Sequence, residues 1–160
     1  MLDWIQSTDY ATWVRESWGW PFALTFHAFG NAMVVGLFFI VAMRLFGLFR
    51  TIPITSLNRL FPIIWLGFGI QVFSGTTLWV SKPARYLADG MFEWKLFFVF
   101  AGLFITLRFQ KLLKQEGGRW QSNGQVPSSA LRFTALTAMA WAAVLVVGRL
   151  TAYLGQLYHA

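Results

Sequence analysis

The stretch from Trp18 to Arg50, WGWPFALTFHAFGNAMVVGLFFIVAMRLFGLFR, decides the fold that the sequence predicts. From Pro21 to Met43 it carries no formal charge, and this many residues can cross a bilayer core of about 30 Å as a helix. His27 and Asn31 lie inside it, four residues apart and therefore on one helix face. Polar side chains within lipid are costly and typical of functional sites. We therefore expect the function to be found beside His27.

The composition of the whole chain is that of a membrane protein. It has 160 residues, which we interpret as one domain, 1–160, and 57% of them are hydrophobic. The charged share is 12%, against about 25% in an average soluble domain. The net charge of +7 would suggest nucleic acid in a soluble chain, but the basic residues gather in two loops, so we expect no nucleic-acid partner. The absence of cysteine excludes disulfides and thiolate metal sites.

Four apolar stretches predict the fold class, which is all-α: an integral membrane four-helix up-down bundle with an N-terminal interfacial amphipathic helix over residues 1–17. A loosely ordered terminus is the alternative for 1–17. The third span must take in Lys95, which then has to reach the interface or find a partner. The basic segment 108–132 is interpreted as a flexible loop. The expected spans are about 19–44, 61–80, 92–112 and 132–157.

The loops after the first and third spans carry eight cations and one acid, whereas the other side has a small excess of acids. The positive-inside rule then places the basic loops in the cytoplasm. We expect a multi-pass protein of the bacterial inner membrane with both termini on the periplasmic side.

A layer of polar residues is predicted in the outer half of the bilayer. His27, Gln71 and Arg149 each lie about nine residues from the outer end of a span, on the order of 13 Å deep at ~1.5 Å per residue. Other polar or small residues flank this depth on the same spans. The candidate cofactor-binding residues of the layer are His27, Gly30, Asn31, Gln71, Ser74, Lys95, Arg149 and Tyr153.

Two of these residues allow a bland and a sharper interpretation. His27 is either a neutral histidine hydrogen-bonded to Asn31 or Gln71, or the axial metal ligand of a haem b, with Gly30 leaving space for the flat macrocycle. Arg149 either reaches to surface acids or lipid phosphate, or holds an anionic ligand group such as a haem propionate; a quinone carbonyl would also serve. The second haem ligand is not evident, and a bis-histidine site would need His27 of another subunit.

Two segments carry a resemblance to known families. SWGWPFALTFHAFGNAMVVG, followed later by ARYLADGMFEWKLFF, resembles a family of small four-helix bacterial inner-membrane proteins of unassigned function. The chain is more loosely similar to the membrane parts of copper-resistance and b-type cytochrome proteins, which bury histidines in four-helix units. The first resemblance implies the fold, and the second implies a cofactor near His27.

The leading hypothesis is a membrane subunit of a redox or electron-transfer assembly that holds a haem b or a quinone. The alternatives are a structural or assembly subunit with no cofactor, and a small transporter. The expected partners are the lipid bilayer and either further copies of the chain or a larger membrane complex. A ladder of small residues, Ala28, Ala32 and Gly36, is interpreted as a helix-packing seam.

Overall fold

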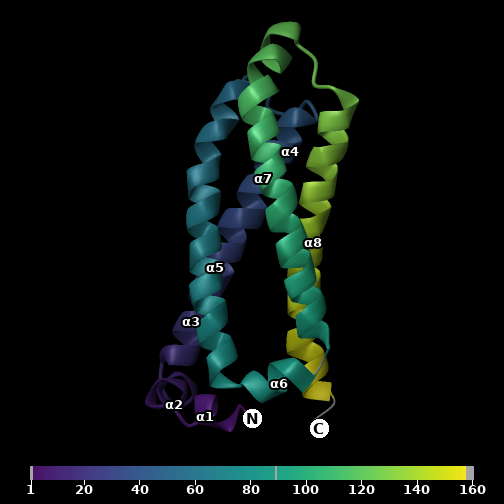
Figure 1. The fold of residues 1–160 in the computed structure, drawn as a ribbon. Helices are drawn as coiled ribbons and strands as arrows, with labels where there is room; N and C mark the ends of the chain where they lie inside the picture. Colours follow the sequence, from purple (N-terminus) through teal and green to yellow (C-terminus); the bar gives the residue numbers. More distant parts are fainter. Residues whose placement is uncertain (1, 89, 158–160) are drawn as a thin grey trace.

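The described residues form helices and no strand, so the all-α class is confirmed. The computed structural model describes residues 2–88 and 90–157, with side chains except at 88, 91 and 151–157. Four helical stretches are long and apolar enough to cross a membrane, and they run alternately up and down along the chain (Figure 1). These stretches are Gly19–Leu45, Ile54–Ser81, Phe92–Asn123 and Ser128–Leu150.

Two of the four stretches combine different kinds of helix. In the first, a π-helical turn interrupts the α-helix directly after Asn31, and such turns are frequent at functional sites. In the second, a 3-10 helix precedes the α-helix, and Pro62 lies in the first turn, where its missing N–H is tolerated. The elements from Gly19 onward are α3 Gly19–Asn31, the π turn η1 Ala32–Gly36, α4 Leu37–Leu45, the 3-10 helix η2 Ile54–Leu60, α5 Phe61–Ser81, α6 Pro83–Ala88, α7 Met91–Asn123 and α8 Ser128–Leu157.

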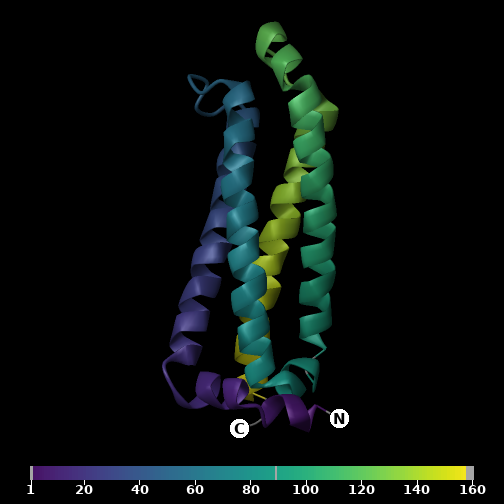
Figure 2. The ribbon, with the colours of Figure 1, turned by 60° about the vertical axis from the view of Figure 1, so that its left-hand side comes forward.

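The N-terminal segment is helical, but it forms two short helices where we expected one. α1, Asp3–Gln6, and α2, Asp9–Glu16, lie across the end of the long helices (Figure 2). Thr8 separates them because its backbone is extended and its side chain accepts a hydrogen bond from the Ala11 N–H, which caps α2. The segment is also held to α5, since the Tyr10 hydroxyl lies 2.8 Å from that of Thr77.

The segment 108–132, which we expected to be a loop, is mostly helical. α7 continues to Asn123 because Phe109, Leu113 and Trp120 are buried along one face, whereas the basic side chains between them are on the outside. The helix ends before Gly124, which adopts a left-handed conformation with a φ of 67°. The prediction failed because we weighed the charges of this segment and overlooked the spacing of its apolar residues.

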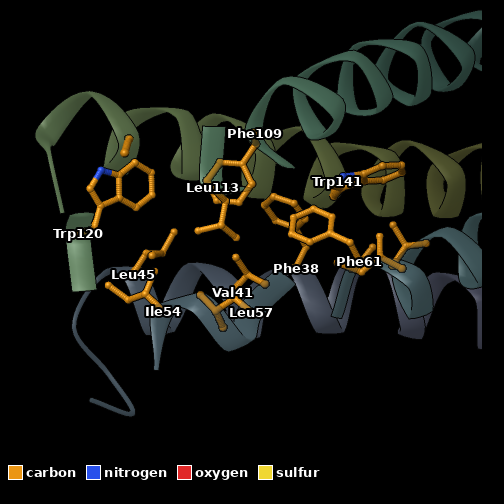
Figure 3. Close-up of a cluster of buried hydrophobic side chains, with 14 of the residues drawn as sticks. Phe38, Val41, Leu45, Ile54, Leu57, Phe61, Phe109, Leu113, Trp120 and Trp141 are labelled. Carbon is orange, nitrogen blue, oxygen red and sulfur yellow. The ribbon is translucent and has the colours of Figure 1, made fainter. Parts of the chain in front are cut away.

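A buried apolar cluster joins all four long helices (Figure 3). Much of it lies toward the end of the helices opposite α1 and α2 (Figure 1). At its centre the ring of Phe109 lies edge-on to Phe38, with ring centres 5.6 Å apart, and contacts Phe61 at 6.3 Å. All three side chains have no exposed surface. We call this region the closed half, because here α4 contacts α8 and η2 contacts α7.

In the other half the helices form two pairs, α3 with α5 and α7 with α8. The first pair is tight: a Cβ added to Gly30 would lie 2.8 Å from the Gly67 carbonyl oxygen. The room that we expected Gly30 to leave for a macrocycle is therefore taken by α5. The ribbons of α5 and α7 separate toward α6, which joins them (Figure 1). We call this region the open half.

Candidate functional site

His27 is held against α5 in the open half. Its Nδ1 atom lies 3.1 Å from the Ser74 hydroxyl oxygen, and that hydroxyl donates to the Ile70 carbonyl at 2.6 Å. Because the Ser74 hydrogen is used in this way, the serine oxygen accepts and His27 Nδ1–H donates. The next residue, Gly75, gives the ring space, since a Cβ there would lie 3.2 Å from His27 Cε1. His27 is thus oriented by two successive residues of α5.

Lys95 reaches His27 from the other helix pair. Its ammonium nitrogen, Nζ, lies 3.4 Å from His27 Nε2. With the proton of the imidazole on Nδ1, Nε2 carries the lone pair, so Lys95 donates and His27 accepts. Gly148 of α8 leaves room for the lysine chain, because a Cβ there would come 3.4 Å from Lys95 Cε. We expected Lys95 either to reach the interface or to find a partner, and in the structure it has a partner, His27 of the first span.

Two cavities lie on either side of this contact, and both His27 and Lys95 line each of them. The first has about 490 Å³ and lies between α5 and α7. Its walls are largely apolar and aromatic, with Phe68, Phe100 and Trp141 among them. The second, also about 490 Å³, lies between α3 and α8. The His27–Lys95 contact therefore forms a polar partition between two spaces of the size that small-molecule sites have.

The structure brings most of the predicted polar layer together. Ser74 and Lys95 contact His27 directly, and Gln71 lines the first cavity. Asn31 and Arg149 line the second. Nδ1 of His27 pairs with the hydroxyl of Ser74, a partner that neither interpretation of the histidine named. Two residues of the predicted layer are not part of this arrangement. Gly30 packs in the contact between α3 and α5, and the side chain of Tyr153 lies outside the described residues.

Several residues that shape the site were not predicted. Gly75 and Gly148 provide the space in which His27 and Lys95 meet. Gly148 was open to prediction, because it adjoins Arg149 and shares a helix face with Trp141 and Val144, at spacings of seven and four. Trp141 lines the first cavity and also belongs to the buried cluster of the closed half, and its indole N–H donates to the Thr106 hydroxyl at 3.0 Å.

Among the described residues, no group of three or more His, Cys, Asp or Glu side chains is placed to hold a metal ion. Comparisons of the chain with protein-family models, with curated proteins and with solved structures found no match. The geometry around His27 and Lys95 is therefore the basis for a functional proposal.

Proposed function

We propose that the chain is a multi-pass membrane protein, folded as an up-down four-helix bundle, that binds a quinone headgroup in its open half. In this proposal it is the membrane subunit of a redox assembly. The observation that carries the proposal is the contact of Lys95 with His27 between two cavities, inside helices that are long and apolar enough to cross a membrane.

Lys95 supplies the first argument for a ligand. An ammonium group has three N–H donors, and the hydrogen bond recorded for Lys95 within the described residues uses one of them, toward His27. Placing a lysine within a bilayer costs at least ~2.5 kcal/mol on insertion scales, so a lysine inside a membrane span is typical of a functional site. A ligand with a carbonyl oxygen would accept from the remaining donors.

The shape of the first cavity supplies the second argument. Phe68, Phe100 and Trp141 line it, and aromatic walls suit a planar ring. A quinone is planar, apolar at its edges and carries carbonyl oxygens, so it suits both the walls and Lys95. When bound it would supply two-electron, two-proton redox chemistry. The chain would contribute the N–H donors of Lys95 Nζ that His27 does not use, while His27 Nε2 orients the lysine and Ser74 fixes the His27 ring.

The same residues suit a haem b less well. Iron needs the lone pair of an imidazole nitrogen, but Nδ1 of His27 faces Ser74 and Nε2 faces Lys95. The space beside Gly30 is filled by α5. We therefore expect protein purified from haem-replete cells to show no Soret band in a reduced-minus-oxidised spectrum. A Soret band that His27→Ala abolishes would replace the quinone by haem in this proposal.

The quinone itself is tested by tryptophan fluorescence. Trp79 and Trp141 line the first cavity, so decylubiquinone should quench the emission of purified protein in phosphatidylcholine nanodiscs in a saturable way. Lys95→Met should weaken the apparent affinity about tenfold, because hydrogen bonds to charged groups contribute ~1.5–3 kcal/mol. Lys82→Met is the matched control, since Lys82 lies over the Trp20 ring, outside the cavities.

Equal affinities for the two lysine variants, or quenching that never saturates, would contradict the quinone site. The polar layer would then be structural, or part of the path of a small transporter. Uptake of a solute into proteoliposomes would distinguish these two alternatives. Uptake that depends on Lys95 would indicate a transporter, and its absence would indicate a structural role.

The orientation in the bacterial inner membrane is part of the same proposal and has its own test. The chain has no cysteine, so single cysteines can be placed at Ser7 and at Asn123. Under the positive-inside rule, Ser7→Cys should react with an impermeant maleimide in intact cells and Asn123→Cys should be protected. The reverse pattern of labelling would contradict the proposed orientation.

A further inference from the structure

A third cavity lies at the opposite end of the long helices from His27. It has about 450 Å³ and is formed where α4 ends, η2 begins and the chain passes from α7 to α8. Arg44, Arg50, Trp120 and Gln121 are among the residues that line it. No Asp or Glu is found among the described residues of its walls. The cavity therefore has two positive charges and no acid to balance them.

Arg44 is the buried member of this pair of arginines, with 8% of its surface exposed. Its Nε donates to the Ile52 carbonyl oxygen, and its Nη2 lies 3.4 Å from the Arg50 carbonyl oxygen. These carbonyls accept hydrogen bonds but carry no formal charge, so they orient the guanidinium without neutralising it. A guanidinium has five N–H donors, and a buried charge is stable when it is paired. An anion in the cavity would provide that pairing.

Arg50 is brought to the same cavity by a tight turn. Its Nε donates to the Gly47 carbonyl at 3.1 Å, and Gly47 has a φ of 98°, which a residue with a side chain rarely adopts. The turn thus fixes Arg44 and Arg50 through its own carbonyl groups. Two guanidinium forks beside one space suit a phosphate group, whose oxygens accept paired N–H donors.

The outer surface of this turn indicates where the phosphate would come from. Its apolar side chains are exposed at the end of a span, where amphipathic and aromatic residues anchor to the interface between membrane and water. This places the mouth of the cavity at the level of the lipid headgroups. The exposed side chains are Phe46, Leu48, Phe49 and Ile52, at 51%, 50%, 52% and 38%.

We propose that this cavity binds a phosphate group, that Arg44 and Arg50 are its ligands, and that an anionic phospholipid headgroup supplies it. Basic pockets between membrane helices are suited to such headgroups. The proposal shares no residue with the quinone site and stands if that site fails. It rests on the cavity, on the carbonyl-held arginines and on the apolar turn beside them.

Native mass spectrometry of the full-length protein in detergent tests this site, with phosphatidylglycerol, phosphatidylcholine and inorganic phosphate as probes. Wild type should retain phosphatidylglycerol in preference to phosphatidylcholine. Arg50→Gln should reduce the bound fraction about fivefold, which corresponds to ~1 kcal/mol for a basic residue near a headgroup. Arg59→Gln is the control, because Arg59 is exposed near the same end and does not line the cavity.

Arg44→Gln should cause a larger loss of lipid than Arg50→Gln. If Arg44→Gln does not fold, Arg50→Gln still decides the matter, because its side chain is exposed. Displacement of phosphatidylglycerol by inorganic phosphate would support a phosphate site at the two arginines. Binding of inorganic phosphate without any retention of phosphatidylglycerol would instead identify free phosphate as the ligand and overturn the lipid. Equal losses in Arg50→Gln and Arg59→Gln would overturn the proposal, and so would equal retention of phosphatidylglycerol and phosphatidylcholine.

Discussion

The closed and open halves of this molecule are made by the same four long helices, yet the helices contact one another differently in the two halves. In the closed half the helices touch directly through fully buried rings such as Phe38 and Phe109. In the open half the two helix pairs approach through Lys95 and His27, with a cavity on either side. Dense packing leaves no room for a ligand, whereas separated pairs with a polar contact between them provide both room and hydrogen-bond donors.

The two halves also differ in how far their polar groups are paired within the chain. In the closed half the Trp65 indole N–H donates to the Gln110 side-chain oxygen at 3.0 Å, so both groups have a partner within the chain. In the open half Lys95 has donors beyond the hydrogen bond to His27. Under the proposed function, the closed half stabilises the fold and the open half provides the room and the donors for a quinone.

The largest effect on stability is expected for Phe38→Ala. Removing a fully buried phenylalanine costs ~3–5 kcal/mol, because the cavity it leaves refills incompletely. Phe100→Ala is the matched variant in the open half, where the same side chain is 65% exposed and lines the first cavity. Thermal unfolding in detergent should show a large fall for Phe38→Ala and a small one for Phe100→Ala. Equal falls would contradict the difference between the halves.

Gly30→Ala should have a smaller but clear effect, because the new Cβ would meet the Gly67 carbonyl oxygen at 2.8 Å and force α3 from α5. Overpacking of this kind costs ~1–3 kcal/mol. Gly69→Ala is the control on α5, because a Cβ at Gly69 meets nothing within 4 Å. The unfolding midpoint should fall for Gly30→Ala and not for Gly69→Ala. If Gly30→Ala is as stable as wild type, α3 and α5 are not closely packed at Gly30.

Ser74→Ala should have a moderate effect that is concentrated on the ligand. It removes the partner of His27 Nδ1–H, which costs ~1–3 kcal/mol when a buried donor is left unsatisfied. Because the ring is then free to rotate, the affinity for decylubiquinone in the quenching titration should fall as well. Thr25→Ala removes a similar hydroxyl that bonds to the Pro21 carbonyl on an exposed face, and it should change neither quantity.

The smallest expected effect concerns Tyr86 in α6, which joins the two helix pairs and packs against Phe92. Burial raises the pKa of the Tyr86 phenol above its ordinary value, and the Arg85 charge offsets part of the rise. A raised pKa favours the neutral form in the folded state. Its contribution to stability is therefore complete below about pH 10, the pKa of an unperturbed tyrosine, and is lost as the pH rises through the folded-state pKa.

The raised pKa of Tyr86 can be measured by titrating the protein in detergent and following the near-ultraviolet absorbance of tyrosinate. Wild type should show a late-titrating component that Tyr86→Phe removes. If that component is the same in both proteins, α6 does not bury the phenol, and the connection between the two pairs is looser than described.

The four apolar stretches could be predicted from the sequence, because each depends on residues that are close together in the chain. The pairing of His27 with Ser74 could not be predicted, since it depends on how α3 and α5 are rotated about their axes. The π turn at Ala32–Gly36 adds to this difficulty: it changes the helix face that α4 presents, which a regular count of 3.6 residues per turn does not anticipate. The role of Gly30 also depended on the neighbouring helix.

Binding of a quinone between the two helix pairs, at His27 and Lys95, can be mapped on the protein by photocrosslinking. A photoreactive azidoquinone would be added to the protein in nanodiscs, with and without excess decylubiquinone, and the labelled peptides would be mapped by mass spectrometry. A quinone bound there should leave labels near His27 or Gln71 on one pair and near Lys95 or Trp141 on the other, all suppressed by decylubiquinone. Labels confined to exposed side chains of the closed half, or labels that decylubiquinone leaves unchanged, would contradict binding at this place.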